Sequence, residues 1–109
     1  MAQFDVHRNI GKQREAIPYV VIVQSSLFDS YRRRVVIPLV RRSNLDTSAA
    51  FIGLSLNPVF TVEGIEVVLH PLEIVSVATD QLGEKIATLA PEGNRITGAM
   101  DELLTRAWA

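Results

Sequence analysis

The sequence predicts a small, mostly β domain that ends in one α-helix. Two short runs dominated by β-branched residues, 20–23 and 35–39, are too short for helices and indicate neighbouring strands joined by a loop. A second pair of runs, 58–62 and 65–69, is joined by Glu63-Gly64, where glycine can take the positive φ of a tight hairpin. Near the end of the chain, apolar residues recur at helical spacing.

Length and composition limit the class of protein. With 109 residues, 48% of them hydrophobic, residues 1–109 can form a single domain that buries one core without a metal or disulfide. The absence of cysteine suits a reducing compartment, and the N-terminal residues do not resemble a signal peptide, so we expect a cytoplasmic protein. Eleven basic and twelve acidic residues nearly cancel, so no direct binding of nucleic acid is expected. The apolar runs are too short to span a membrane.

The N-terminal residues 3–7 alternate between polar and apolar, which predicts a half-buried strand with Phe4 and Val6 on its buried side. The same alternation places Gln3, Asp5 and His7 towards solvent. A surface histidine is favoured over a catalytic or metal-binding one, because only His70 and no cysteine could join it. The polar stretch 9–18 predicts a loop.

The two central runs lack strict polar alternation, which predicts strands covered on both faces at the centre of the sheet. Pro38 has no amide hydrogen, so we expect its nitrogen to face away from a partner strand or to mark a bulge, with a bend there. Five arginines flank the second run, without interleaved aromatic residues that could stack on bases. We therefore predict solvated strand ends or intramolecular ion pairs, not a nucleic-acid surface, for Arg32, Arg33, Arg34, Arg41 and Arg42.

The middle of the chain is less regular. Residues 43–56 predict a connection that could hold one short helical turn at 49–52. After the hairpin, His70-Pro71 interrupts the chain and 74–78 resumes as a strand. Residues 80–90 have a mixed pattern, in which three apolar residues are available for the core: Leu82, Ile86 and Leu89.

The pattern of the last segment of the chain, from Pro91 onwards, predicts an α-helix. Pro91 suits a first helical turn, and Glu92 suits the positive end of the helix dipole. Gly98, within the helix, costs about 1 kcal/mol relative to alanine, which indicates either close approach of another backbone or a tolerated weakness. Trp108 either covers the core or is exposed for a partner. The apolar face consists of Ile96, Met100, Leu103, Leu104 and Ala107.

The sequence contains no recognisable catalytic arrangement. There is no glycine-rich phosphate loop, no paired histidine and cysteine, and no metal-ligand spacing. Ser25 and Ser26 have no histidine or acid with them in a motif. We therefore expect neither an enzyme nor a bound metal or cofactor.

The central block resembles the signature region of the CcdB toxins. The residues that carry the resemblance match without a gap: Val23-Gln24-Ser25, Leu27-Phe28-Asp29, Arg33-Arg34 and Val36-Ile37-Pro38-Leu39. Shorter similarities occur at Gln3-Phe4 with Val6, Pro58-Val59, 75–77, and Gly83-Glu84 with Ala87 and Leu89. The resemblance covers most of the chain and is specific in the central block.

This resemblance implies a homodimer whose chains have an SH3-like β-barrel of the CcdB/MazF type, an attached small sheet and a C-terminal helix. It also implies the toxin of a toxin–antitoxin module for plasmid maintenance. Such a toxin binds the A subunit of DNA gyrase, traps the gyrase–DNA cleavage complex and is neutralised by a CcdA-like antitoxin. It is a topoisomerase inhibitor, not an enzyme. Gyrase contact positions of the family fall on Leu27 and Phe28 and, in the helix, on Asp101 and Leu104.

The C-terminal end departs from the family pattern. In the best-known toxins the helix finishes Trp-Gly-Ile, whereas a gapless extension places Thr105, Arg106 and Ala107 at those positions. Trp108 then follows one turn late, rotated by about 300° and about 4.5 Å further along the helix. Trp108 could therefore still project near the same face, and we assign it to the gyrase-binding surface.

Two alternatives remain open. The MazF ribonucleases have the same fold, and a MazF-like protein would cleave RNA with the arginines together with Ser25 or His7. A CcdB-like dimer could instead bind an antitoxin without poisoning gyrase. The signature favours the CcdB interpretation.

Overall fold

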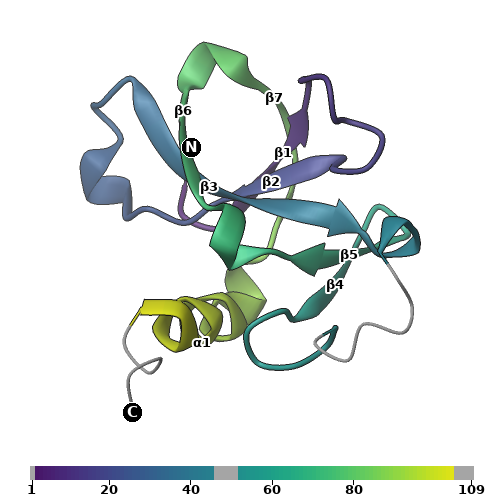
Figure 1. Cartoon of the computed structure of the whole chain (residues 1–109). Helices are drawn as coiled ribbons and strands as arrows, with labels where there is room; N and C mark the ends of the chain where they lie inside the picture. Colours follow the sequence, from purple (N-terminus) through teal and green to yellow (C-terminus); the bar gives the residue numbers. More distant parts are fainter. Residues whose placement is uncertain (1, 46–51, 105–109) are drawn as a thin grey trace.

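A computed structural model describes residues 2–45 and 52–104. Within these residues, all paired strands are antiparallel and follow the order β4-β5-β3-β2-β1-β7, with β6 also paired to β3 (Figure 1). One α-helix, α1 (Gly93–Leu104), follows the sheet. The strands are β1 (Asp5–Asn9), β2 (Tyr19–Ile22), β3 (Arg33–Arg41), β4 (Val59–Val62), β5 (Ile65–Leu69), β6 (Val75–Ala78) and β7 (Leu82–Thr88).

The sheet is curled into a half-barrel. In Figure 1, β6 and β7 arch over one side of the central strands, and α1 lies on the other side. This arrangement fits an SH3-like barrel with a C-terminal helix, so the predicted fold class is confirmed. No helix among the described residues is long and apolar enough to cross a membrane.

The two central runs form β2 and β3, which lie inside the sheet as predicted. Residues two apart in a strand point to the same side, and one face of these strands contributes to a core cluster that residues of β1, β4, β5 and α1 share. Ile96 and Ala99 bring one face of α1 into this core. The cluster includes Val6, Tyr19, Val21, Ile37, Leu39, Phe60, Val67, Leu69 and Ile96.

The predicted hairpin is confirmed as β4 and β5. Glu63 and Gly64 form its turn with φ angles of 51° and 77°. Two successive positive φ values are characteristic of the type I′ turn, whose twist matches that of the flanking strands. Glycine takes the second position without steric cost, whereas Glu63 is held there by bonds of its side chain to Tyr19 and Arg8.

Strand β3 changes its partner at Pro38. Residues 33–36 pair with β6, and residues 39–41 pair with β5. The His70 N–H donates a 3.1 Å hydrogen bond to Pro38 O. In a strand, the backbone nitrogen and oxygen of one residue point to the same edge of the strand. The Pro38 nitrogen therefore points to the place where β3 changes its partner from β6 to β5, and no amide hydrogen is needed there. Pro38 thus lies between the segments of β3 that pair with β6 and with β5, where a residue without an amide hydrogen is tolerated.

The solvent-facing placement of Asp5 and His7 was wrong. Both residues are only 4% exposed, and their side chains contact β7, in which Lys85 Nζ lies 3.5 Å from Asp5 Oδ1. Residues 82–88 form strand β7, where the sequence indicated only a mixed pattern. His7 Nδ1 lies 2.9 Å from Gly83 O in this strand. The predicted strand at 3–7 begins later, at Asp5, because Phe4 has a positive φ of 71°.

Helix α1 confirms the predicted C-terminal helix. A short 3₁₀ turn, η5 (Ala90–Glu92), contains Pro91 and leads directly into it. Ile96 is buried, whereas Leu104 is exposed. A Cβ at Gly98 would meet no atom within 4 Å, so among the described residues this glycine is a tolerated weakness and not a close approach. Ala107 and Trp108, and residues 49–51 of the suggested helical turn, lie outside the described residues.

Candidate partner-binding surface

Two predicted contact residues lie on the loop that joins β2 to β3, which we call the signature loop (residues 23–32). Its 3₁₀ turn, η1 (Ser26–Phe28), carries Leu27 and Phe28, which are 86% and 46% exposed. Tyr31 follows and is 65% exposed, and its ring centroid lies 5.9 Å from that of Phe28. The loop therefore displays three large apolar side chains to solvent.

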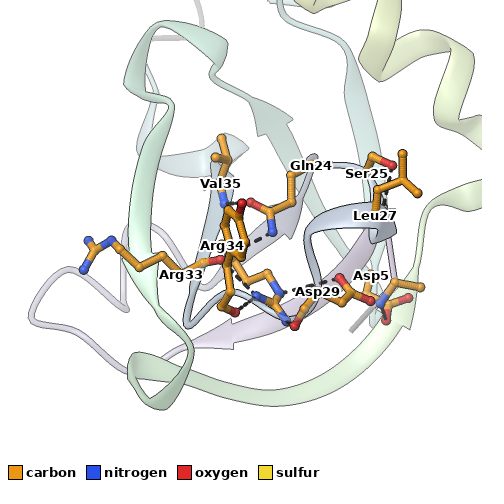
Figure 2. Close-up of polar contacts among 10 residues, drawn as sticks. Asp5, Gln24, Ser25, Leu27, Asp29, Arg33, Arg34 and Val35 are labelled. Carbon is orange, nitrogen blue, oxygen red and sulfur yellow. Dashed lines mark hydrogen bonds and ion pairs between the residues drawn. The ribbon is translucent and has the colours of Figure 1, made fainter.

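Gln24 closes the base of the signature loop (Figure 2). Its Nε2 donates to Arg33 O at 3.3 Å, and its Oε1 accepts from the Val35 N–H at 2.9 Å. A primary amide offers a donor and an acceptor, as a peptide group does. The Gln24 side chain therefore extends the pairing of β2 with β3 beyond the last backbone hydrogen bonds.

Ser25 starts the 3₁₀ turn. Its Oγ accepts a hydrogen bond from the Leu27 N–H at 3.2 Å, and its carbonyl oxygen accepts one from the Phe28 N–H at 3.1 Å. A serine hydroxyl in this position satisfies an amide that has no partner within the turn. The serine of the signature thus fixes the backbone that carries Leu27 and Phe28.

Arg34 lies beneath the signature loop and is only 5% exposed. Its Nη2 donates to Asp29 O at 2.7 Å, and its Nη1 donates to Tyr31 O and to Arg33 O (Figure 2). Its Nε lies 3.8 Å from Asp29 Oδ1. Burial of a guanidinium is costly unless its donors are satisfied, and the three carbonyl groups satisfy Nη1 and Nη2. Nε has no hydrogen-bond partner and has only the ion pair with the Asp29 carboxylate.

Arg33 and Arg42 also have partners within the chain. Arg33 points away from Arg34 and donates to Ser76 Oγ and Ser76 O at 2.9 and 2.8 Å. Arg42 forms an ion pair of 2.7 Å with Glu66. The prediction of intramolecular roles at the ends of the second strand is confirmed for these residues.

The remaining predicted contact residues belong to the C-terminal helix. Asp101 and Leu104 lie on the last turn of α1, and both are exposed. The turn η1 and the end of this helix both lie towards the left in Figure 1. Trp108 lies outside the described residues, as do residues 105–107.

The structure does not assemble the catalytic residues that a ribonuclease of this fold would need from His7 and Ser25. His7 is buried and contacts β7, whereas the Ser25 hydroxyl accepts a hydrogen bond from the Leu27 amide within its own turn. Within residues 2–45 and 52–104, no group of three potential metal ligands is found.

The comparison with known families identifies the chain. The family model described as CcdB protein matches residues 3–105. The chain belongs to the CcdB family. No curated protein gives a significant match. CcdB membership supports the assignment as the toxin of a toxin–antitoxin module, with an antitoxin as its kind of partner, and not as an enzyme itself.

The CcdB signature has a structural explanation that the sequence alone did not provide. Gln24, Ser25, Asp29 and Arg34 hold the loop by hydrogen bonds and an ion pair. These residues carry the family resemblance, but the sequence alone gives none of them an individual role. Tyr31 has no signal in the sequence other than its position three residues after Phe28.

Proposed function

We propose that this CcdB family protein binds the A subunit of DNA gyrase and traps the complex in which DNA is cleaved. The observation that supports this proposal best is the display of Leu27 and Phe28 on an ordered loop. Exposed apolar side chains on a soluble surface favour protein–protein contact, and a loop fixed before binding loses little conformational entropy on association. Asp101, Leu104 and Trp108 complete the proposed gyrase-binding surface.

The proposal includes the assembly and the setting of the toxin. Residues 1–109 act as a single domain, two copies form a homodimer, and a CcdA-like antitoxin neutralises it. The protein acts in the cytoplasm, where it contributes to plasmid maintenance. It contacts gyrase and not nucleic acid directly, consistent with its nearly balanced charge.

A DNA-cleavage assay tests the proposal. Gyrase from the source organism, supercoiled plasmid and ATP are incubated with the protein, and the linear DNA released by denaturing the gyrase is measured. The parent should increase linear DNA in a dose-dependent way. The variant with Leu27→Ala and Phe28→Ala should need at least a tenfold higher concentration, with an unchanged melting temperature, because both side chains are exposed.

Ile10→Ala serves as the matched control, since Ile10 is 55% exposed on a different loop. It should poison gyrase as well as the parent does. Binding of gyrase without accumulation of cleaved DNA would contradict poisoning and favour a CcdB-like protein that has lost this activity. Absence of gyrase binding, measured with the purified A subunit, would overturn the proposal as a whole.

A further inference from the structure

The signature loop contains more apolar surface than the two residues assigned to gyrase. Tyr31 is 65% exposed, and its ring forms a tilted pair with Phe28 at 5.9 Å between centroids. The Tyr31 N–H donates to Phe28 O at 3.1 Å, so the two residues are also linked through the backbone. Phe28 and Tyr31 therefore form one exposed aromatic pair, and the exposed Leu27 precedes it in the same 3₁₀ turn.

The orientation of this surface depends on a buried side chain. The Arg34 guanidinium donates to the carbonyl groups of Asp29, Tyr31 and Arg33. These carbonyl groups are distributed along the part of the loop that leads into β3. A planar guanidinium has several donors in fixed directions, whereas a lysine ammonium is a single point on a flexible stem. Only arginine can therefore hold these carbonyls in this arrangement.

We propose that the signature loop is a preformed recognition element in which Tyr31 is a third gyrase contact residue and Arg34 is the positioning residue. The proposal rests on gyrase binding as the function. The partner site that fits this surface is an apolar recess on the gyrase A subunit, because Tyr31 pairs with Phe28 and Leu27 precedes this pair in the same turn. An aromatic pair adds contact area with few rotatable bonds, so little entropy is lost on binding.

The contact part of the proposal is tested with Tyr31→Ala. Affinity for the purified gyrase A subunit, measured by calorimetry, should fall at least tenfold, while the melting temperature stays that of the parent. Ile10→Ala again provides the control and should bind normally. If the parent does not bind the subunit, the proposed function fails and this inference fails with it. If the parent binds and Tyr31→Ala binds equally well, the inference alone is overturned.

The positioning part is tested without any partner. Amide hydrogen exchange of Phe28, Asp29 and Tyr31 reports the loop, because these three amides donate within it. Arg34→Lys should increase the exchange rates of these three amides at least tenfold more than those of the Val21 and Ile37 amides. The amides of Val21 and Ile37 serve as the reference, because they report overall stability. Its affinity for the gyrase A subunit should fall at least tenfold.

Arg33→Lys is the matched control, since Arg33 is adjacent and bonds outward to Ser76. It should leave the exchange of the loop amides unchanged. Equal exchange of these amides in Arg34→Lys and in the parent would show that Arg34 does not hold the loop. Faster exchange in Arg34→Lys with unchanged affinity would show that preforming the loop contributes nothing to recognition.

Discussion

Gly93, the first residue of α1, lies directly against the ring of Phe4. A Cβ built on Gly93 would be 2.5 Å from Phe4 Cε2, closer than two carbon atoms can approach. The ring cannot move aside easily, because the Phe4 backbone has a φ of 71° and is held by hydrogen bonds to Ile22 and Leu89. This contact joins the N-terminal segment to the start of the helix.

Gly93→Ala should therefore destabilise the protein. Added volume in a packed site costs about 1 to 3 kcal/mol, and each kcal/mol lowers the melting temperature of a domain near this size by about 4 to 8 °C. Gly98→Ala in the same helix is the control, because a Cβ there meets open space among the described residues. It should stabilise the protein by about 0.5 to 1 kcal/mol. Thermal unfolding of both variants measures the difference, and equal effects would contradict the contact.

Local patterns were sufficient to predict much of this fold. The hairpin of β4 and β5 followed from two β-branched runs and Gly64, and the helix followed from apolar residues at helical spacing. Strand β7 was missed because Leu82–Thr88 contains glycine and two charged residues and only one β-branched aliphatic residue. Its strand conformation comes from pairing with β1, a contact between distant parts of the chain.

The candidate site was predicted only in part. The family resemblance indicated Leu27 and Phe28, and their exposure agrees with a contact surface. The roles of Gln24 and Arg34 could not be derived from the sequence, because they depend on which backbone carbonyls the folded loop brings within reach. The burial of His7 was missed because His7 contacts β7, a strand that local sequence patterns did not predict.

We expect a symmetric homodimer in solution. The family resemblance implies this assembly, and Leu72 on η3 (Pro71–Glu73), which is 72% exposed, is available for such an interface. Light scattering at micromolar concentration should give twice the mass of the chain. The mass of one chain at that concentration would exclude the dimer.

We also expect no ribonuclease activity. His7 is buried in the sheet, and the Ser25 hydroxyl accepts the Leu27 amide, so the two do not form an acid–base pair. Incubation with mixed RNA should leave the RNA intact on a denaturing gel. Specific cleavage that is lost in His7→Ala or Ser25→Ala would instead favour a MazF-like activity.

Trp108 is predicted to contact gyrase. A tryptophan ring near the C-terminal end of a helix attracts a cation, and a guanidinium over its face contributes about 0.5 to 2 kcal/mol. A dimer could use both copies, so Trp108→Ala should weaken gyrase binding with nearly unchanged melting temperature. Truncation of a core tryptophan would cost about 3 to 5 kcal/mol. Early unfolding of the variant, or undiminished gyrase binding, would therefore assign Trp108 to the fold.

The hydrogen bond between Tyr19 and Glu63 makes stability depend on alkaline pH. Burial raises the pKa of Tyr19, and the 3.0 Å bond from its hydroxyl to Glu63 Oε1 raises this pKa further, because both favour the neutral phenol. The unfolded chain loses this proton at the ordinary tyrosine pKa of about 10. The stabilisation due to neutral Tyr19 is therefore complete below that pH and is lost as pH rises through the raised folded pKa.

Tyr19→Phe should remove this dependence. Near neutral pH the variant should be less stable by about 0.5 to 1.5 kcal/mol, the usual value of one hydrogen bond. This difference in the free energy of unfolding, measured with urea, should shrink as pH rises above about 10, because only the parent then loses the contribution of the phenol. Tyr31→Phe, at an exposed tyrosine, is the control for the loss of a hydroxyl group as such. If the difference in the free energy of unfolding between Tyr19→Phe and the parent stays constant up to the highest pH at which the protein folds, the phenol makes no pH-dependent contribution. The stability of this part of the sheet would then depend on the packing of the Tyr19 ring alone.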